Sequence, residues 1–136
     1  MESVSEMHAS GTVDTRQRAS IAAGVDWLRL EQLYWDATRR VTFGVVWFSS
    51  DALRVLGVWP VLLRFGPLVD GRRMILGGLF ARRPGGTIEW RSDGVHVAVE
   101  VVGFAPLLPG PLWRIELLLH DLVGRRFLTY VAREAG

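Results

Sequence analysis

The hydrophobic pattern of the chain begins after a short polar segment. Residues 1–13 are small and polar with no hydrophobic period, which is typical of a flexible tail. From Asp14 onward, apolar side chains recur at the spacing of one helix face. They are Ile21, Val25, Leu28 and Trp35. Because Gly24 and Asp26 can end one helix and start another, the pattern predicts either one kinked helix or two short ones.

The middle of the chain changes to a β pattern, rich in β-branched and aromatic residues. Four apolar runs predict strands, at residues 41–48, 53–58, 61–65 and 74–80. Asp70-Gly71 is a two-residue hairpin signal that joins the last two of these runs. It pairs Val69 with Arg72. In the same register, Phe65 faces Leu76.

A second hairpin signal, Asp93-Gly94, sets a register that the side chains support. Pairing Ser92 with Val95 places Trp90 opposite Val97 on an apolar face. The other face then carries polar and charged residues: Thr87, Glu89, Arg91, His96 and Glu100. Such a division into two faces is what a half-buried antiparallel sheet requires.

Residues 112–130 fit two patterns. Apolar residues alternate with Arg114 and Glu116, which suits a strand of a hairpin. The apolar positions also form a continuous helical stripe over about five turns. The stripe consists of Leu112, Ile115, Leu119, Val123, Phe127 and Tyr130. We favour the helix, since Pro111 suits its first position, although Gly124 is unfavourable inside a helix.

Together these elements predict one α+β domain over residues 14–136. It has an N-terminal helix, a curved antiparallel sheet of about six strands and a long C-terminal helix. A mostly-β barrel with an N-terminal helix is the alternative. Gly77-Gly78 falls inside a predicted strand, where glycines mark a bend that lets a sheet curl around a helix.

Composition narrows the chemistry that this domain can perform. Every one of its 16 basic side chains is arginine, and the chain has no cysteine. Without lysine there is no Schiff base, and without cysteine there is no disulfide, thiolate zinc site or thiol nucleophile. The sequence also lacks a nucleophile elbow, a dinucleotide-binding glycine motif and a phosphate loop. We therefore expect no cofactor and no bound metal.

Charge gives little support for a macromolecular partner. The net charge is only +2, and the sequence pI of about 9.9 follows from the absence of lysine. Four arginine pairs occur, and we expect them to be solvated: Arg39-Arg40, Arg72-Arg73, Arg82-Arg83 and Arg125-Arg126. No signal peptide and no run of apolar residues long enough to span a bilayer are present. We expect a cytoplasmic protein with no nucleic-acid partner and no membrane partner.

The order of elements over residues 15–134 resembles the helix-grip fold of the START, polyketide-cyclase and plant-allergen superfamily. In that superfamily, a curved antiparallel sheet wraps a long C-terminal helix and leaves a cavity for an apolar ligand. The resemblance implies the same arrangement here. The superfamily begins with a strand before its helices, whereas residues 1–13 show no strand pattern. Three short stretches, at 40–44, 77–86 and 120–128, also look like small actinobacterial proteins, a likeness that implies no function.

An excess of apolar surface predicts a ligand pocket. Both faces of residues 41–48 are apolar, and so is nearly the whole circumference of the C-terminal helix. We expect aromatic side chains to line a pocket for an apolar, polyketide-like molecule. The candidates are Trp47, Trp90, Trp113 and Tyr130. Packing of these residues in an ordinary core and burial in a dimer interface are the alternatives.

Two groups of titratable residues are candidates for acid–base chemistry. His96 with Glu100 and Glu89 can serve as the base and its orienting groups for proton abstraction next to a carbonyl. The solvated face of an antiparallel sheet is the alternative for these three residues. His120 stands one helical turn after Glu116, and we expect an exposed ion pair there rather than the mouth of a cavity.

The sequence thus predicts a small-molecule-binding domain. Its candidate activity is a cofactor-independent cyclisation or isomerisation in secondary metabolism, such as antibiotic biosynthesis, because that chemistry needs only shape, desolvation and an acid or base. The alternative is a non-enzymatic carrier, or an interaction module that forms a homodimer through residues 112–130.

Overall fold

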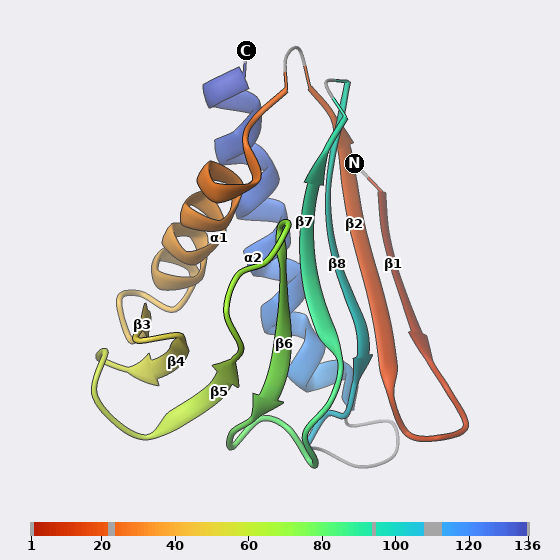
Figure 1. Cartoon of the computed structure of the whole chain (residues 1–136), viewed down its shortest axis with the longest axis vertical. Helices are drawn as coiled ribbons and strands as arrows, with labels where there is room; N and C mark the ends of the chain where they lie inside the picture. The colour runs from red at the N-terminus through yellow and green to blue at the C-terminus, as the bar shows by residue number, and fades with distance from the viewer. Residues whose placement is uncertain (1, 22–23, 94, 108–112, 136) are drawn as a thin grey trace.

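The computed structural model describes residues 2–21, 24–93, 95–107 and 113–135, without the side chains of residues 2, 113, 115 and 135. The described residues form one antiparallel sheet of eight strands and two helices (Figure 1). The strands are β1 (Glu2–Met7), β2 (Val13–Ser20), β3 (Val46–Ser49), β4 (Ala52–Val55), β5 (Val61–Phe65), β6 (Arg72–Gly77), β7 (Thr87–Ser92) and β8 (His96–Phe104). The helices are α1 (Trp27–Val41) and α2 (Trp113–Ala135).

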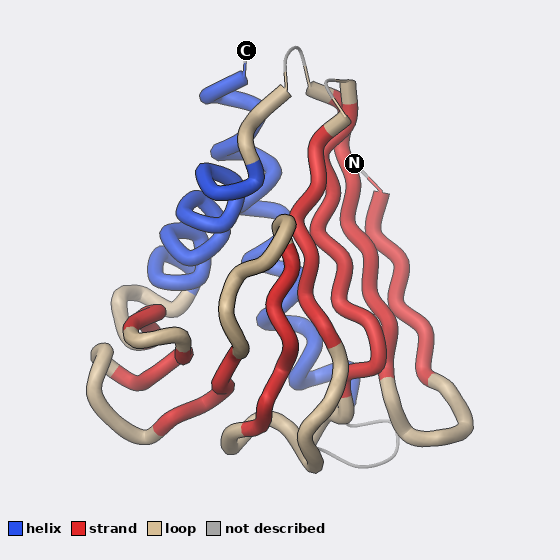
Figure 2. The backbone as a smooth tube through the Cα atoms, viewed as in Figure 1, coloured by secondary structure: helices blue, strands red, loops and turns tan. Residues whose placement is uncertain are grey.

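The sheet curls at one end, and this curl shapes the interior. Its strand order is β1-β2-β8-β7-β6-β5-β4-β3, with every neighbouring pair antiparallel. The long strands lie side by side, whereas β5, β4 and β3 turn toward the C-terminal end of α1 (Figure 2). The two helices pack against each other, and α2 also contacts β2 and β8. The α+β class predicted from the sequence is therefore confirmed, but the sheet has eight strands and not about six.

The largest correction concerns the chain before α1. The helix predicted from Asp14 onward begins only at Trp27, and β2 occupies much of the intervening segment. In β2, Val13, Thr15 and Gln17 point inward and are buried, while their neighbours in sequence are more exposed. Because two of these inward residues are polar, the alternation is not a hydrophobic one and the sequence did not reveal a strand. Residues 2–7 form β1, which pairs with β2.

The strand predicted at residues 41–48 is also shorter in the structure. Val41 is the last residue of α1, and β3 starts at Val46. A turn separates them, with Phe43 at φ 55° and Gly44 at φ 81°. The predicted strand was therefore too long. Val41, its first residue, belongs to α1, and a turn separates α1 from β3.

The structure confirms the turn predicted for the first hairpin, but the register of its two strands differs from the prediction. Val69 and Arg72 form the expected bridge. Phe65 pairs with Ile75, one residue away from the predicted partner Leu76, because the register of β5 and β6 shifts after Arg64. An irregularity of this kind changes which face a side chain points to, and sequence spacing does not show it.

The second hairpin has a longer turn than predicted. Ser92 pairs with Val97, two residues beyond the predicted partner Val95. The Asp93 carboxylate accepts hydrogen bonds from the backbone N–H groups of Val95 and His96, at 3.0 and 2.7 Å, and so stabilises this wider turn. A shift of two residues keeps every side chain on its predicted face, although it changes each cross-strand partner.

Residues 113–135 form the long C-terminal helix that the stripe pattern favours. The glycine inside it has a packing role. A Cβ atom at Gly124 would clash with the side-chain amide of Gln17, which is buried and donates a hydrogen bond to the Asp121 carbonyl at 3.1 Å. Gly124 therefore lets β2 approach the helix closely, which offsets its unfavourable helix propensity.

Neither helix, as far as the structure describes it, carries an apolar stretch of the length needed to span a bilayer.

Candidate functional site

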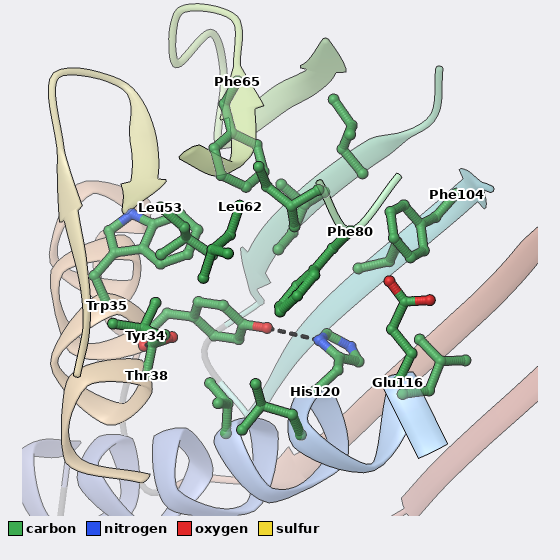
Figure 3. A pocket seen from close by; sticks show the side chains of 18 residues that line it. Tyr34, Trp35, Thr38, Leu53, Leu62, Phe65, Phe80, Phe104, Glu116 and His120 are labelled. Atoms are coloured by element: carbon green, nitrogen blue, oxygen red, sulfur yellow. Dashed lines mark hydrogen bonds between the residues drawn. The ribbon is translucent and has the colours of Figure 1, made fainter. Parts of the chain in front are cut away.

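An apolar cavity of about 110 Å³ lies between the curled sheet and the two helices. Side chains from both helices and from strands β3 to β8 line it, and most are aliphatic or aromatic. They include Trp35, Leu53, Phe65, Phe80 and Phe104 (Figure 3). Its volume approaches that of engineered apolar cavities of roughly 150 Å³, which bind benzene. The cavity therefore suits a molecule of about one aromatic ring.

Helical spacing places the cavity residues of each helix on one face. In α1, Tyr34 and Thr38 are one turn apart and both face the cavity. In α2, Glu116, His120 and Val123 follow the same face over two turns. Each helix thus contributes two polar side chains to a lining that is otherwise apolar.

One hydrogen-bonded cluster joins the two helices to the sheet at the cavity wall. The Tyr34 hydroxyl lies 2.8 Å from His120 Nδ1 (Figure 3), and the Thr15 hydroxyl lies 2.9 Å from His120 Nε2. Tyr34 and Thr15 are buried. Both ring nitrogens of His120 are therefore hydrogen-bonded, and α1, α2 and β2 each supply one member of the cluster.

The cluster is uncharged at neutral pH. Burial lowers the pKa of His120 to about 4, and the opposing effect of the Asp121 carboxylate is smaller. Burial also raises the pKa of the Tyr34 phenol above its ordinary value. A neutral imidazole has one N–H donor and one acceptor nitrogen, so it matches the two hydroxyl groups on either side of it.

The tautomer of His120 determines what the cluster offers to a ligand. When Nδ1 carries the proton, it donates to the Tyr34 oxygen, and Nε2 accepts from the Thr15 hydroxyl. The hydroxyl proton of Tyr34 is then available to an acceptor in the cavity. The carboxylate of Glu116 also points into this space (Figure 3). A carbonyl compound would thus find a hydrogen-bond donor and a carboxylate in the same apolar cavity.

The three predicted acid–base residues do not line this cavity. His96, Glu89 and Glu100 lie on the other face of the sheet. Glu89 and Glu100 face each other across β7 and β8, and the Arg91 guanidinium pairs with both. His96 lies 3.6 Å from an Asp93 carboxylate oxygen, although it borders the same surface depression as Glu100. The structure therefore brings the two glutamates together and leaves His96 with a different carboxylate.

The predicted aromatic lining residues also lie elsewhere. Trp90 is fully buried in the core, with its ring centroid 5.5 Å from that of Tyr34. Trp47 packs beside the turn after α1, and its indole N–H donates to the Gly44 carbonyl. Tyr130 borders a groove between the two helices. The side chain of Trp113 lies outside the described residues.

Sequence reasoning missed the central residues of the cavity. We expected His120 and Glu116 to form an exposed pair, and this was wrong, since both line the cavity. Two polar residues one turn apart, within a helix that is otherwise apolar on most sides, were the available signal. Tyr34 and Thr15 gave no such signal, because their contacts with His120 join residues 86 and 105 positions apart.

Among the described residues, no three histidine, aspartate or glutamate side chains gather closely enough to hold a metal ion.

In comparisons with known proteins, no family model matches the chain, and no curated protein matches it significantly.

Proposed function

We propose that the protein binds a compact apolar molecule with a carbonyl group in the cavity between the sheet and the helices. The observation that carries this proposal is an apolar cavity whose wall holds one neutral hydrogen-bonding cluster, Tyr34–His120–Thr15. Binding sites for small molecules commonly combine an apolar lining with a few placed polar groups. A carbonyl oxygen is the ligand group that the Tyr34 hydroxyl would recognise.

The order of elements supports the helix-grip resemblance on which the expectation of an apolar ligand rests. The superfamily begins with a strand before its helices, and β2 stands before α1. Six strands, β3 to β8, then follow α1, and the long helix α2 comes last. The sheet curls at its β5–β3 end toward α1, while α2 contacts β2 and β8 (Figure 1).

The size of the cavity limits the ligand. A volume of about 110 Å³ accommodates roughly one ring, so a polycyclic polyketide would require the cavity to open. We therefore propose a single-ring or short-chain ketone, or one end of a longer molecule of that chemistry.

The first test compares two probes of the same shape, acetophenone and ethylbenzene. Titrations followed by tryptophan fluorescence are expected to show about fivefold tighter binding of acetophenone, since one hydrogen bond contributes about 1 kcal/mol. In Tyr34→Phe, which lacks the hydroxyl, the two probes should bind equally. Val123→Phe, which fills part of the cavity, should weaken both, and Val95→Phe in an exposed turn should weaken neither. Saturable binding of neither probe would contradict the proposal.

A second candidate function, isomerisation of the bound ketone, is favoured by the position of Glu116. Its carboxylate can take a proton from the carbon next to the carbonyl. The electron pair of that C–H bond then forms an enolate, whose oxygen accepts the hydrogen bond from Tyr34. In a β,γ-unsaturated ketone the enolate is conjugated with the neighbouring double bond, so return of the proton from Glu116 to the γ-carbon gives the α,β-unsaturated isomer and uses no cofactor.

The proton-transfer step can be tested without knowledge of the natural substrate. In D₂O, the protein is expected to accelerate deuterium uptake at the methyl group of acetophenone, as followed by proton NMR. Glu116→Gln should reduce this rate by at least about a hundredfold, a magnitude typical of loss of a general base. Glu100→Gln on the outer face of the sheet is the matched control and should keep the rate. Binding of acetophenone without any exchange would leave a non-enzymatic carrier as the function.

The alternative of a homodimer through residues 112–130 stays a prediction. Most of the apolar surface of α2 packs inside the domain, and Leu118 and Leu122 are its large apolar side chains that remain exposed among those described.

A further inference from the structure

Two loops at one corner of the molecule expose apolar side chains to solvent. They are residues 42–45, between α1 and β3, and residues 56–60, between β4 and β5 (Figure 1). The exposed residues are Phe43 (96%), Trp59 (76%), Val58 (70%), Leu56 (57%) and Val45 (46%). The Leu56 N–H donates to the Val45 carbonyl at 2.7 Å, so the two loops lie side by side. We call these five residues the apolar corner.

The indole of Trp47 holds this corner in a fixed arrangement. Its N–H donates to the Gly44 carbonyl in the first loop. It also packs against Gly57 in the second loop, where a Cβ atom would lie 2.9 Å from the indole ring. On the side of α1, the Arg39 guanidinium lies 4.1 Å from the centroid of the Trp47 ring. The contacts of Trp47 with both loops and with Arg39 therefore hold the exposed apolar residues in one arrangement.

A groove rich in arginine continues from the apolar corner between α1 and α2. Arg39 and Arg40 border it from α1, and Arg125 and Arg126 border it from α2. Phe43 borders the groove as well, so it belongs to both features. Two arginine pairs that are far apart in sequence therefore meet here, next to the exposed loops. We call these four arginines the arginine groove.

Positive charge in the arginine groove is only partly neutralised. Asp36 is the one carboxylate among the described residues that line it. Arg125 pairs with Asp121 at 2.9 Å. Within the described part of the chain, the other three arginines form no ion pair with a carboxylate. An anionic partner would supply the missing countercharge.

We propose that the apolar corner and the arginine groove together dock the protein onto a membrane that contains anionic lipids. Aromatic and aliphatic side chains enter the interfacial region of a bilayer, while nearby arginines bind lipid phosphates. The absence of a spanning segment led us to expect no membrane partner. Docking of this kind needs no such segment, because exposed apolar side chains and basic residues are sufficient for it.

The composition of this surface favours a membrane over other partners. A nucleic acid would be held by the arginines alone and would leave Val58, Leu56 and Val45 exposed to water. A symmetric dimer centred on the apolar corner would cover the apolar side chains but would bring no anionic group to the arginine groove of either copy. An anionic bilayer would bury the apolar corner and would also supply phosphates to the arginine groove. This inference does not depend on the proposed ligand of the cavity.

The test is co-sedimentation of the full chain with phosphatidylcholine vesicles, with and without one third phosphatidylglycerol, at low and moderate salt. We expect binding to the anionic vesicles at low salt, with a blue shift of tryptophan emission, and little binding to phosphatidylcholine alone. Phe43→Ser with Trp59→Ser should lower the vesicle partition coefficient about tenfold or more. Arg125→Gln with Arg126→Gln should lower it about tenfold and flatten its salt dependence.

Matched control variants lie away from the corner. Leu28→Ser on α1 replaces a half-exposed apolar residue, and Arg18→Gln with Arg133→Gln removes two arginines on β2 and α2. Both should bind vesicles like the unmodified chain. Absence of sedimentation with anionic vesicles at low salt would overturn the proposal. So would a dimer, seen by light scattering, that dissociates in Phe43→Ser with Trp59→Ser. Binding of duplex DNA without binding of vesicles would also overturn it.

Discussion

Arg73→Met is expected to lower the free energy of unfolding by about 3–5 kcal/mol, because it leaves a buried carboxylate without its partner. Arg73 is 8% exposed and Glu31 is 5% exposed. The Arg73 guanidinium donates to Glu31 Oε1 at 2.9 and 3.1 Å. It also donates to Asp51 and to the Gly66 carbonyl, and so joins α1 to β6 and to the β3–β4 turn.

This buried pair also supports the cavity. The indole N–H of Trp35 donates to the same Glu31 oxygen at 2.9 Å. The Trp35 ring lines the cavity and stacks on Phe48, with ring centroids 4.4 Å apart. Loss of Arg73 should therefore alter the packing around Trp35, with a change in its fluorescence even where the chain still folds.

Urea unfolding of three variants measures the effect. Arg72→Met is the matched control, since Arg72 is exposed and its pair with Glu89 should contribute no more than about 1 kcal/mol. Glu31→Leu combined with Arg73→Met should be more stable than Arg73→Met alone, because the double variant leaves no buried charge at this position. Equal stability of Arg73→Met and Arg72→Met would contradict the role of the buried pair.

Acidification is expected to destabilise the protein through His120. Its pKa is lowered from an ordinary 6.5 to about 4 by burial, so the unfolded chain binds a proton at a higher pH than the folded chain does. Stability is therefore unaffected by this group above pH 6.5 and falls as the pH drops toward 4. Integrated between pH 7 and 4.5, the loss is roughly 2 to 3 kcal/mol.

The comparison of variants isolates this contribution. Asn at position 120 has no titrating ring, so His120→Asn should lose less stability than the unmodified protein between neutral and acid pH. His96→Asn on the surface should keep the full loss. His8 acts in the opposite direction, because its hydrogen bond to Asp14 raises its pKa. Its stabilising effect is thus present at acid pH and lost as the pH rises. Identical acid unfolding of His120→Asn and the unmodified protein would refute the assignment.

Local patterns predicted those elements whose periodicity is set by burial alone. The apolar stripe predicted α2, and the run at Val61–Phe65 matches β5. The turn at Asp70-Gly71 follows from its own residues. These elements need no information from distant parts of the chain.

The elements that the sequence missed are those whose inward residues are polar. Thr15 and Gln17 face the interior because His120 and Asp121 on α2 satisfy their hydrogen-bonding groups. Without knowledge of α2's position, β2 shows no hydrophobic alternation. The same contact explains Gly124 in α2, because any larger residue there would clash with the Gln17 side chain.

A ligand-binding role for the cavity stays a prediction, and the residues that line it do not include Trp47, Trp90 or Tyr130. An apolar pocket follows from the excess of apolar positions, which composition and periodicity show. Its polar residues depend on a contact between Tyr34 and His120, which lie on two different helices. Trp47, Trp90 and Tyr130 were expected to line the pocket because they are large aromatic residues, and residue type does not indicate which side of an element faces a cavity.

The most direct measurement of the central claim is a titration with acetophenone monitored by NMR of the labelled histidine rings and tryptophan indoles. We expect saturable shifts of the His120 ring nitrogens and of the Trp35 indole, with the spectra of His96 and Trp59 unchanged. Tyr34→Phe should remove the shift at His120 Nδ1. Saturable shifts confined to His96 and Trp59, or no saturable shift at His120, would contradict a ligand-binding role for the cavity.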